Sequence, residues 1–474
     1  MSAERGPRAG LALAGLLLAS AGPSLSQTLV VPALAEIERH FDASADAATW
    51  ALTGFLLSVT VSTPLAGKLG DVYGRRRVLI GVIAAFAAGS VACALADSIE
   101  VLIAGRIVQG VSGGVFPLAF GIIRETFPPA RVPTAIGAVS ATFGIGAALG
   151  LSLSGVLVEG AGLDWLFWIG LAIVPAAGLV AIGLPAERPR RRAGIDWLGA
   201  LLLSGALGCV LVGVSNAEDW GWGSAATLGA LGGGLGLAGL FAATEARRAE
   251  PLVDLVLLRA RPVLMSNLTG LAIGFVMFAA FLLIPRVAQE PEASGYGLSA
   301  SVSEAGLLMA PGAVAMICAG PLAGVLASRR SSRAPLALGA VAATAALTVL
   351  TASHGDVLSL TLAVIALGAG IGFVFAAMAN VVVESVPSGE VGIATGINTI
   401  TRTIGGALGA QVAIAIVSAG EASGGTGADS PYTEAFVVSA VIACAAVAAA
   451  LAVPRARRPV QPEPDQPLDA RLTS

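Results

Sequence analysis

The sequence predicts an all-α membrane protein that crosses a bilayer many times, and three observations lead to this class. Of its 474 residues, 56% are apolar and only 12% are charged, whereas an ordinary soluble domain carries roughly a quarter charged residues. Apolar runs recur from one end of the chain to the other, and several exceed the roughly 18 residues that mark a membrane span. The basic residues gather in alternate links between these runs, which is the pattern that orients membrane proteins.

The apolar runs predict fourteen membrane-spanning helices joined by short links. They cover residues 10–34, 48–67, 78–97, 101–124, 133–158, 165–184, 196–214, 225–243, 264–287, 303–327, 334–352, 357–383, 391–418 and 434–453. The first run has an alternative interpretation as a secretory signal peptide, because Leu11–Ala21 resembles its apolar region and Ala19-Ser20-Ala21 its cleavage site. The apolar stretch continues to about Leu34, however, and this length favours a membrane span.

The positive charges predict which ends of these helices face the cytoplasm. An even number of spans puts both termini on one side of the membrane. The links and tails of that side carry nearly all the basic residues, namely Arg5, Arg8, Lys68, Arg75–Arg77, Arg131, Arg188, Arg190–Arg192, Arg247, Arg248, Arg259, Arg261, Arg329, Arg330, Arg333, Arg455, Arg457, Arg458 and Arg471. The opposite links hold only Arg39 and Arg286. We therefore predict that both termini are cytoplasmic.

Composition also bounds the partners and the compartment. The net charge of −3 gives no reason to expect nucleic acid as a partner, and the lipid bilayer is the expected surrounding. The four cysteines lie in four different apolar runs and the two histidines are isolated, so no metal site and no cofactor is predicted. Lys68 is the only lysine, a bias that suggests a GC-rich genome and hence a bacterial cytoplasmic (inner) membrane.

The two halves of the chain resemble each other, which predicts an internal duplication. Pro64-Leu65-Ala66-Gly67 recurs as Pro321-Leu322-Ala323-Gly324, and a longer match keeps one constant offset from Val115 and Val374 to Gly150 and Gly409. Duplicated halves are typical of transporters that rock around a central site. We expect an N-terminal six-helix bundle (1–190), two extra transmembrane helices (191–250) and a C-terminal six-helix bundle (251–454). Residues 455–474, rich in proline and charge, are expected to form a disordered cytoplasmic tail.

The link between the second and third spans carries the pattern Gly67-Lys68-Leu69-Gly70-Asp71-Val72-Tyr73-Gly74-Arg75-Arg76-Arg77. Glycines allow a tight turn, and Asp71 is suited to cap the next helix or to pair with an arginine. The pattern resembles the loop signature of the major facilitator superfamily. The alternative is a basic loop that only fixes topology. The resemblance implies a cytoplasmic gate formed by Gly67, Gly70, Asp71, Gly74, Arg75 and Arg76.

The fourth span contains Arg106-Ile107-Val108-Gln109-Gly110, which resembles the second signature of the same superfamily. A buried arginine is costly in a membrane and therefore indicates function. The alternative is that Arg106, roughly 9 Å below the membrane surface at 1.5 Å per residue, extends its side chain to the outer interface. The resemblance implies that Arg106 and Gln109 take part in coupling or binding. Ser26 and Gln27 of the first span are expected, with Gln109, to satisfy part of the five donors of Arg106.

Two further glycine-rich spans extend the resemblance. The fifth span carries Gly137, Gly144, Gly146, Gly150 and Gly155, a spacing similar to an antiporter signature, although Leu151 stands where that signature has proline. The resemblance implies close helix packing at Gly146, Gly150 and Gly155. Ordinary small-residue packing is the alternative.

The thirteenth span carries Asn398 and Arg402, followed by Gly405, Gly406 and Gly409. This pattern, together with fourteen spans, resembles the fourteen-span drug/proton antiporter branch of the superfamily. The resemblance implies that the three glycines pack against a neighbouring helix and that Asn398 and Arg402 serve transport. At about eleven residues, or roughly 16 Å, into the span, Arg402 is expected to face a central cavity.

The resemblance covers nearly the whole chain and implies a secondary active transporter, not an enzyme. It would export small drug-like or secondary-metabolite molecules by alternating access, with protons entering in exchange. An uptake or uncoupled carrier for a neutral or anionic small molecule is the alternative. A membrane enzyme would need a catalytic cluster, and the sequence offers no paired carboxylates, His/Cys set or Ser/His/Asp set. A sensor would not need buried arginines.

One departure from the branch bears on coupling and on the substrate. Ser26 stands where the branch usually has an aspartate, and no acidic residue falls at mid-depth of a predicted span. Arginine stays protonated, so the transported proton needs another carrier. The nearest candidates are Glu125, Glu159, Glu304 and Glu384 at span ends. A cavity with two arginines and no acid predicts a neutral or anionic substrate.

Overall fold

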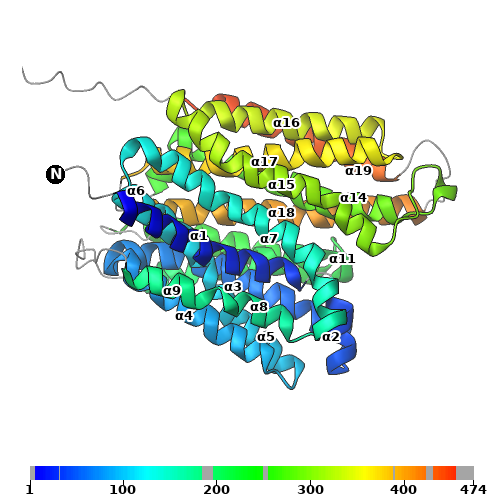
Figure 1. The fold of residues 1–474 in the computed structure, drawn as a ribbon, viewed down its shortest axis with the longest axis horizontal. Coiled ribbons are helices and arrows are strands. Elements are labelled where there is room, and N and C mark those ends of the chain that lie inside the picture. Colours follow the sequence, from blue (N-terminus) through cyan, green and yellow to red (C-terminus); the bar gives the residue numbers. More distant parts are fainter. Residues whose placement is uncertain are drawn as a thin grey trace, which may run out of the picture.

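The computed structural model describes residues 6–30, 33–183, 196–248, 255–387, 390–422 and 431–454. Every regular element within these residues is a helix, and the long helices run roughly along one common direction (Figure 1). The tail 455–474, predicted to be disordered, and residues 184–195 lie outside the described residues.

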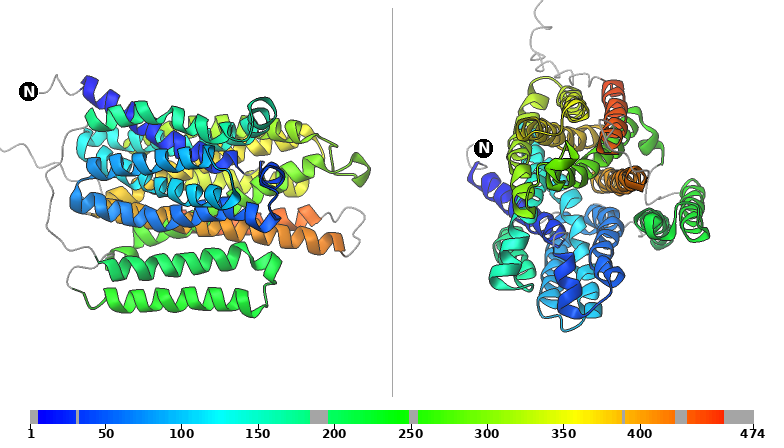
Figure 2. Two further views of the ribbon diagram at one scale, coloured as in Figure 1. Left: turned by 90° about the horizontal axis from the view of Figure 1, so that it is seen from below. Right: turned by 90° about the vertical axis from the view of Figure 1, so that its right-hand side faces the viewer.

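The first half of the chain forms what we call the N-terminal set of helices. Its members are α1 (Gly6–Leu29), α2 (Leu34–Phe41), α3 (Ala45–Tyr73), α4 (Arg75–Ala94), α5 (Ile99–Gly110), η1 (Val111–Gly114), α6 (Val115–Thr126), η2 (Pro129–Arg131), α7 (Val132–Ala161), α8 (Trp165–Ala172) and α9 (Val174–Gly183). Three helices follow, which are α10 (Trp197–Ser215), α11 (Ala217–Trp220) and α12 (Ala225–Glu245). The helices α10 and α12 pack as a pair at one edge of the molecule (Figure 2), and α10 also contacts α3 and α18.

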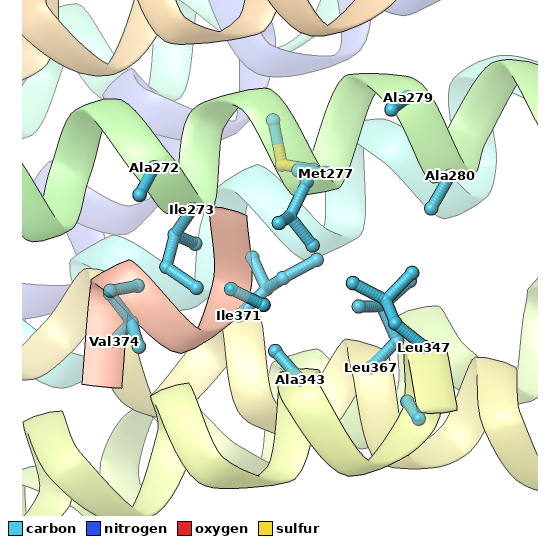
Figure 3. Packing of buried hydrophobic residues seen from close by; sticks show 14 of the residues in the cluster. Ala272, Ile273, Met277, Ala279, Ala280, Ala343, Leu347, Leu367, Ile371 and Val374 are labelled. Atoms are coloured by element: carbon cyan, nitrogen blue, oxygen red, sulfur yellow. The ribbon is translucent and has the colours of Figure 1, made fainter. Parts of the chain in front are cut away.

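The second half forms the C-terminal set. Its members are α13 (Leu255–Arg259), α14 (Arg261–Gln289), η3 (Glu292–Ser294), α15 (Val302–Arg329), α16 (Arg333–Ala352), α17 (Val357–Ser385), α18 (Val391–Ala422) and α19 (Pro431–Ala452). Aliphatic side chains of α14, α16 and α17, among them Ile273, Leu347 and Ile371, form the centre of one apolar core (Figure 3). Burial of such side chains removes apolar surface from solvent and holds the set together.

Eleven helices in the described part of the chain are long and apolar enough to cross a membrane. One of them joins α5, η1 and α6, and another joins α8 and α9. The predicted count of fourteen spans is not confirmed, because α1, α7 and α10 are not among the eleven. A helix nevertheless occupies each predicted span, and α1, α7 and α10 have 24, 30 and 19 residues.

The structure corrects three local predictions. The link predicted at 68–77 is a single residue, since α3 continues to Tyr73 and α4 begins at Arg75. Within this predicted link only Gly74, with φ of 97°, has the positive φ that favours glycine. Gly67, Gly70 and Asp71 lie inside the helix α3. The first helix ends at Leu29 instead of 34, and the short helix α2 was not predicted. The fourth span is interrupted by η1, which contains two of its glycines.

Candidate functional site

A cavity lies between the two sets of helices. It encloses about 1060 Å³ of empty space, part of which is open to solvent. Its wall consists of Pro23, Ser24, Gln27, Thr28, Leu52, Phe55, Leu56, Val59, Ser112, Gly113 and Phe116 from the N-terminal set, and of Met277, Phe278, Phe281, Met316, Thr399, Arg402 and Thr403 from the C-terminal set. A mostly apolar wall with a few polar groups is the usual character of a small-molecule site.

Arg402 lies in the cavity wall, where a central arginine was predicted. Its side chain projects from α18, and only 8% of the residue is exposed. The guanidinium carbon lies 4.2 Å from the centroid of the Phe375 ring, which comes from α17. A cation over an aromatic face is attracted by the ring quadrupole, so Phe375 supports the charge and fixes its position.

Asn398 lies one helical turn from Arg402 but is not part of the wall. Its amide nitrogen donates to the side-chain oxygen of Asn267 at 2.8 Å, and this bond joins α18 to α14. Both amides are buried, so the bond satisfies polar groups that would otherwise be costly. Asn267 was missed by sequence reasoning, because a single asparagine in an apolar helix gives no motif.

Arg106 is fully buried beside the cavity and not in its wall. Its Nε donates to the Ala51 carbonyl at 3.0 Å, and its Nη1 donates to the Ser26 carbonyl at 3.1 Å and to Oε1 of Gln109. The guanidinium lies 4.1 Å from the centroid of the Phe55 ring, and that ring belongs to the wall. Arg106 therefore cross-links α1, α3 and α5 and reaches the cavity only through Phe55.

The predicted partners of Arg106 are only partly found. Gln109 accepts from Arg106 and donates to Oγ of Ser90 at 2.8 Å, as part of one buried chain of hydrogen bonds. Ser26 contributes its carbonyl oxygen, while its hydroxyl has no hydrogen-bond partner among the described residues. Gln27 lies in the cavity wall and not beside Arg106, because successive residues of a helix point in directions about 100° apart.

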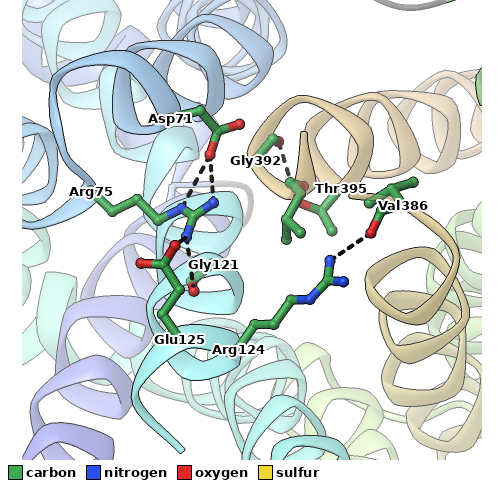
Figure 4. A network of polar contacts seen from close by, with 9 residues as sticks. Asp71, Arg75, Gly121, Arg124, Glu125, Val386, Gly392 and Thr395 are labelled. Atoms are coloured by element: carbon green, nitrogen blue, oxygen red, sulfur yellow. Dashed lines mark hydrogen bonds and ion pairs between the residues drawn. The ribbon is translucent and has the colours of Figure 1, made fainter. Parts of the chain in front are cut away.

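A second polar cluster, which we call the gate network, consists of Asp71, Arg75 and Glu125 (Figure 4). Nη2 and Nε of Arg75 lie 2.6 and 3.1 Å from Oδ1 of Asp71, and Nη1 lies 2.6 Å from Oε1 of Glu125. Nη1 of Arg75 also donates to the Gly121 carbonyl at 3.2 Å. One buried arginine thus holds the ends of α3, α4 and α6 together.

The gate network borders a contact between the two sets. Gly392, on α18 of the C-terminal set, lies beside Asp71 of the N-terminal set (Figure 4). Nearby, Nη1 of Arg124 donates to the carbonyl of Val386 at 2.8 Å, again from one set to the other (Figure 4). Arg76, predicted to belong to the gate, donates instead to the carbonyl of Ile182 within its own set. The next residue after a buried arginine lies on a different face of α4.

Close backbone approaches seal the same end of the cavity. A Cβ on Gly67 would lie 2.4 Å from the carbonyl carbon of Gly392, so α3 and α18 touch there. A Cβ on Gly324 would lie 2.5 Å from the carbonyl oxygen of Pro133, so α15 and α7 touch in the same way. The two contacts correspond in the sequence repeat, which pairs Gly67 with Gly324 and Pro133 with Gly392. We call this end the sealed end.

Most of the predicted packing glycines lie against a neighbouring helix, and one does not. A Cβ on Gly146 would lie 2.4 Å from the Ser24 carbonyl oxygen, and one on Gly150 would lie 1.8 Å from Oγ1 of Thr28. Equivalent approaches join α18 to α14 at Gly405, Gly406 and Gly409. Gly70 approaches the Leu118 side chain within its own set. The prediction for Gly155 is wrong, since a Cβ there would meet nothing within 4 Å.

Three of the four predicted acidic candidates, Glu125, Glu304 and Glu384, do not line the cavity. Glu304 completes a capping box with Ser301, and Glu384 accepts from Oγ of Ser332 at 2.8 Å. Glu125 belongs to the gate network, and the side chain of Glu159 lies outside the described part. Within the described residues, no group of three or more His, Cys, Asp or Glu side chains is arranged to hold a metal ion.

Comparison with known proteins identifies the class of this chain. A family model described as Major Facilitator Superfamily matches residues 16–410. The chain belongs to this superfamily of membrane transporters, and it is accordingly a multi-pass membrane protein that moves small molecules. Its relatives are transporters and not enzymes.

Several relatives are named for resistance or export. The chain is 33% identical to a tetracenomycin C resistance and export protein of Streptomyces glaucescens, over 82% of this chain and 72% of that protein. It is 28% identical to a multidrug resistance protein B homolog of Mycobacterium tuberculosis, over 83% and 73% of the two chains. The match to an uncharacterized transporter of the same organism covers 57% of that protein. The structure of the human organic anion transporter MFSD10 (TETRAN) has the same fold, with a TM-score of 0.60, 16% identity and coverage of 93% of this chain and 100% of that chain.

Proposed function

We propose that this protein exports small drug-like or secondary-metabolite molecules by alternating access. The observation that carries the proposal is a cavity between two duplicated sets of helices that is sealed at one end. The names of the relatives add support, because they include tetracenomycin C export and multidrug resistance. In this cycle the two sets rock about the cavity, so that the gate network opens while the opposite end closes.

We propose further that α1, α7 and α10 complete a set of fourteen spans in a bacterial inner membrane. The basic residues Arg75–Arg77, Arg131 and Arg329–Arg330 all lie at the sealed end. By the positive-inside rule, that end and both termini are then cytoplasmic. The cavity accordingly represents the outward-facing state, in which a substrate leaves the cell. In this arrangement α10 and α12 are the two extra helices, which stand between the duplicated bundles in the sequence and at one edge of the molecule in space (Figure 2).

Proton entry is the proposed driving force. Since no acidic side chain of the described part lines the cavity, the proton must act elsewhere. Glu125 is the candidate that this structure supports best, because its partner Arg75 also holds Asp71, and Asp71 contacts the opposite set. Neutralising either carboxylate weakens the charge-assisted bonds that hold the ends of α3, α4 and α6 in place at the sealed end.

Reconstitution into proteoliposomes tests the proposal. Tetracenomycin C is offered to inside-out vesicles with an acidic or a neutral interior, and its accumulation is followed. Proton-coupled export predicts concentrative uptake only when the interior is acidic. Uptake that is the same at both interior pH values and stops at equilibration would favour the uncoupled carrier. The described cavity wall, which holds no carboxylate, agrees with that alternative.

A further inference from the structure

We propose that the substrate is an aromatic compound with an acidic group, and that Arg402 binds this group as an anion. This inference rests on the proposed transport function and names its substrate class. Arg402 is the one charged side chain in the cavity wall within the described part of the chain. The residue is largely buried, and a low effective dielectric around a buried group strengthens its field.

The surroundings of Arg402 present a small polar face to the cavity. Thr399 and Thr403 lie three residues before it and one residue after it on α18, and both line the wall. Each threonine hydroxyl donates to a carbonyl of its own helix, at 3.0 and 3.1 Å. The guanidinium plane offers a fork that matches a carboxylate or a sulfonate, and the ring of Phe375 fixes this fork from behind.

The rest of the wall suits a flat, apolar body. Phe55, Phe278 and Phe281 line the same space as Arg402, and Met277 adds a thioether that adapts to irregular shapes. Aromatic rings prefer offset-stacked or edge-to-face contacts with other rings, and each such contact adds to the area that is buried. The wall therefore fits an aromatic ring system whose acidic oxygen reaches Arg402.

The charge balance disfavours a cation. Within the described residues, Arg106 bonds to carbonyl oxygens and an amide oxygen and lies over an aromatic ring, and none of these groups carries a negative charge. Its positive charge lies behind Phe55 and adds to the field of Arg402 in the cavity. A cationic substrate would meet two positive charges and no carboxylate among the described wall residues, whereas an anion meets attraction from both.

The charge of the substrate also sets the response to membrane potential. Export of a monoanion against one entering proton moves two elementary charges per cycle, whereas export of a monocation against one proton moves none. Each charge that crosses a potential of about 100 mV changes the equilibrium gradient by about fiftyfold. A transporter of this design is thus driven by the inside-negative potential as well as by the pH gradient.

Two xanthene dyes of opposite charge test the inference. Fluorescein is anionic and rhodamine 123 is cationic, and fluorescence anisotropy measures the binding of each to the purified full-length protein. We expect fluorescein to bind more tightly and Arg402→Gln to weaken it about tenfold or more. Arg402→Lys should retain only part of the affinity, because it keeps the charge but not the planar fork. The matched control Arg286→Gln removes an exposed arginine of α14 and should bind as the parent does.

The parent protein alone already decides between the outcomes, so the test does not depend on how the variants fold. Tighter binding of rhodamine 123, or no binding of fluorescein, would overturn the inference. Equal binding of fluorescein by a folded Arg402→Gln variant would overturn the role of Arg402. Fluorescein that binds as expected but never crosses the membrane in vesicles would refute the transport function and leave the anion site standing.

Discussion

Asp71 offers the sharpest test of the gate network, through the substitution Asp71→Asn. The carboxylate is 4% exposed, accepts two hydrogen bonds from Arg75 and lies beside Gly392 of the opposite set. The substitution preserves size but turns charge-assisted bonds into neutral ones. Bonds to charged groups contribute about 1.5–3 kcal/mol and neutral bonds about 0.5–1.5 kcal/mol. Because Glu125 still pairs with Arg75, the expected net loss in the sealed state is about 1–2 kcal/mol.

A loss of that size changes the ratio of sealed to open molecules by roughly 5- to 30-fold. Two assays report it. Substrate transport in proteoliposomes should fall, because the cycle can no longer close the gate end efficiently. Alkylation of a cysteine introduced by Thr395→Cys, close to Gly392 at the sealed end, should become faster from that end.

The matched control is Asp97→Asn, which changes an exposed carboxylate beyond the far end of α4. It should transport and react as the parent does. Parental transport and parental alkylation in a well-inserted Asp71→Asn variant would refute the reasoning. In that case the motif would serve topology alone, which was the alternative interpretation of its arginines.

Three further predictions concern packing and the buried arginine. Arg106→Lys should lower transport about tenfold or more with normal insertion, because a lysine cannot reproduce three bonds to Ala51, Ser26 and Gln109 in one plane. A fully active lysine variant in the vesicle assay would show that only the charge of Arg106 matters. Gly67→Ala should hold the sealed end open and speed its alkylation, since the new Cβ overlaps the backbone of Gly392, whereas Gly81→Ala, which meets nothing within 4 Å, should not. Gly150→Ala should lower the melting temperature through its overlap with Thr28, and Gly155→Ala should leave it unchanged; equal melting temperatures would contradict the packing account.

The helices were largely predictable from sequence because apolar length alone defines a membrane span. The residues at which the helices begin and end were less predictable. The link at Gly74 was predicted too long, since Lys68 and Asp71 interrupt the apolar run. The helix α3 nevertheless continues through both residues, and Asp71 is paired with Arg75. The helix α2 was missed because apolar Ile37 stands among charged neighbours.

The site was predictable only where a motif named a residue. Arg402 in the cavity wall and Arg75 in an ion pair with Asp71 followed from patterns and depth. The partners could not be predicted, because Phe375 and Asn267 come from other helices and carry no local signal. Gln27 was expected beside Arg106 because the two residues lie at similar depth, but it lines the cavity instead. Equal depth in the membrane does not place two side chains on facing sides of their helices.

The claim that the two sets rock about the cavity is tested most directly by measuring distances at both ends of one molecule. The four native cysteines are replaced by serine, and spin labels are attached in pairs. One pair, Arg77→Cys with Arg330→Cys, spans the sets at the sealed end, and the other, Asp97→Cys with Val357→Cys, spans them at the opposite end. The account predicts that adding Asp71→Asn lengthens the first distance and shortens the second in the same population. Distances that change together in the same direction, or that do not change at either end, would contradict alternating access.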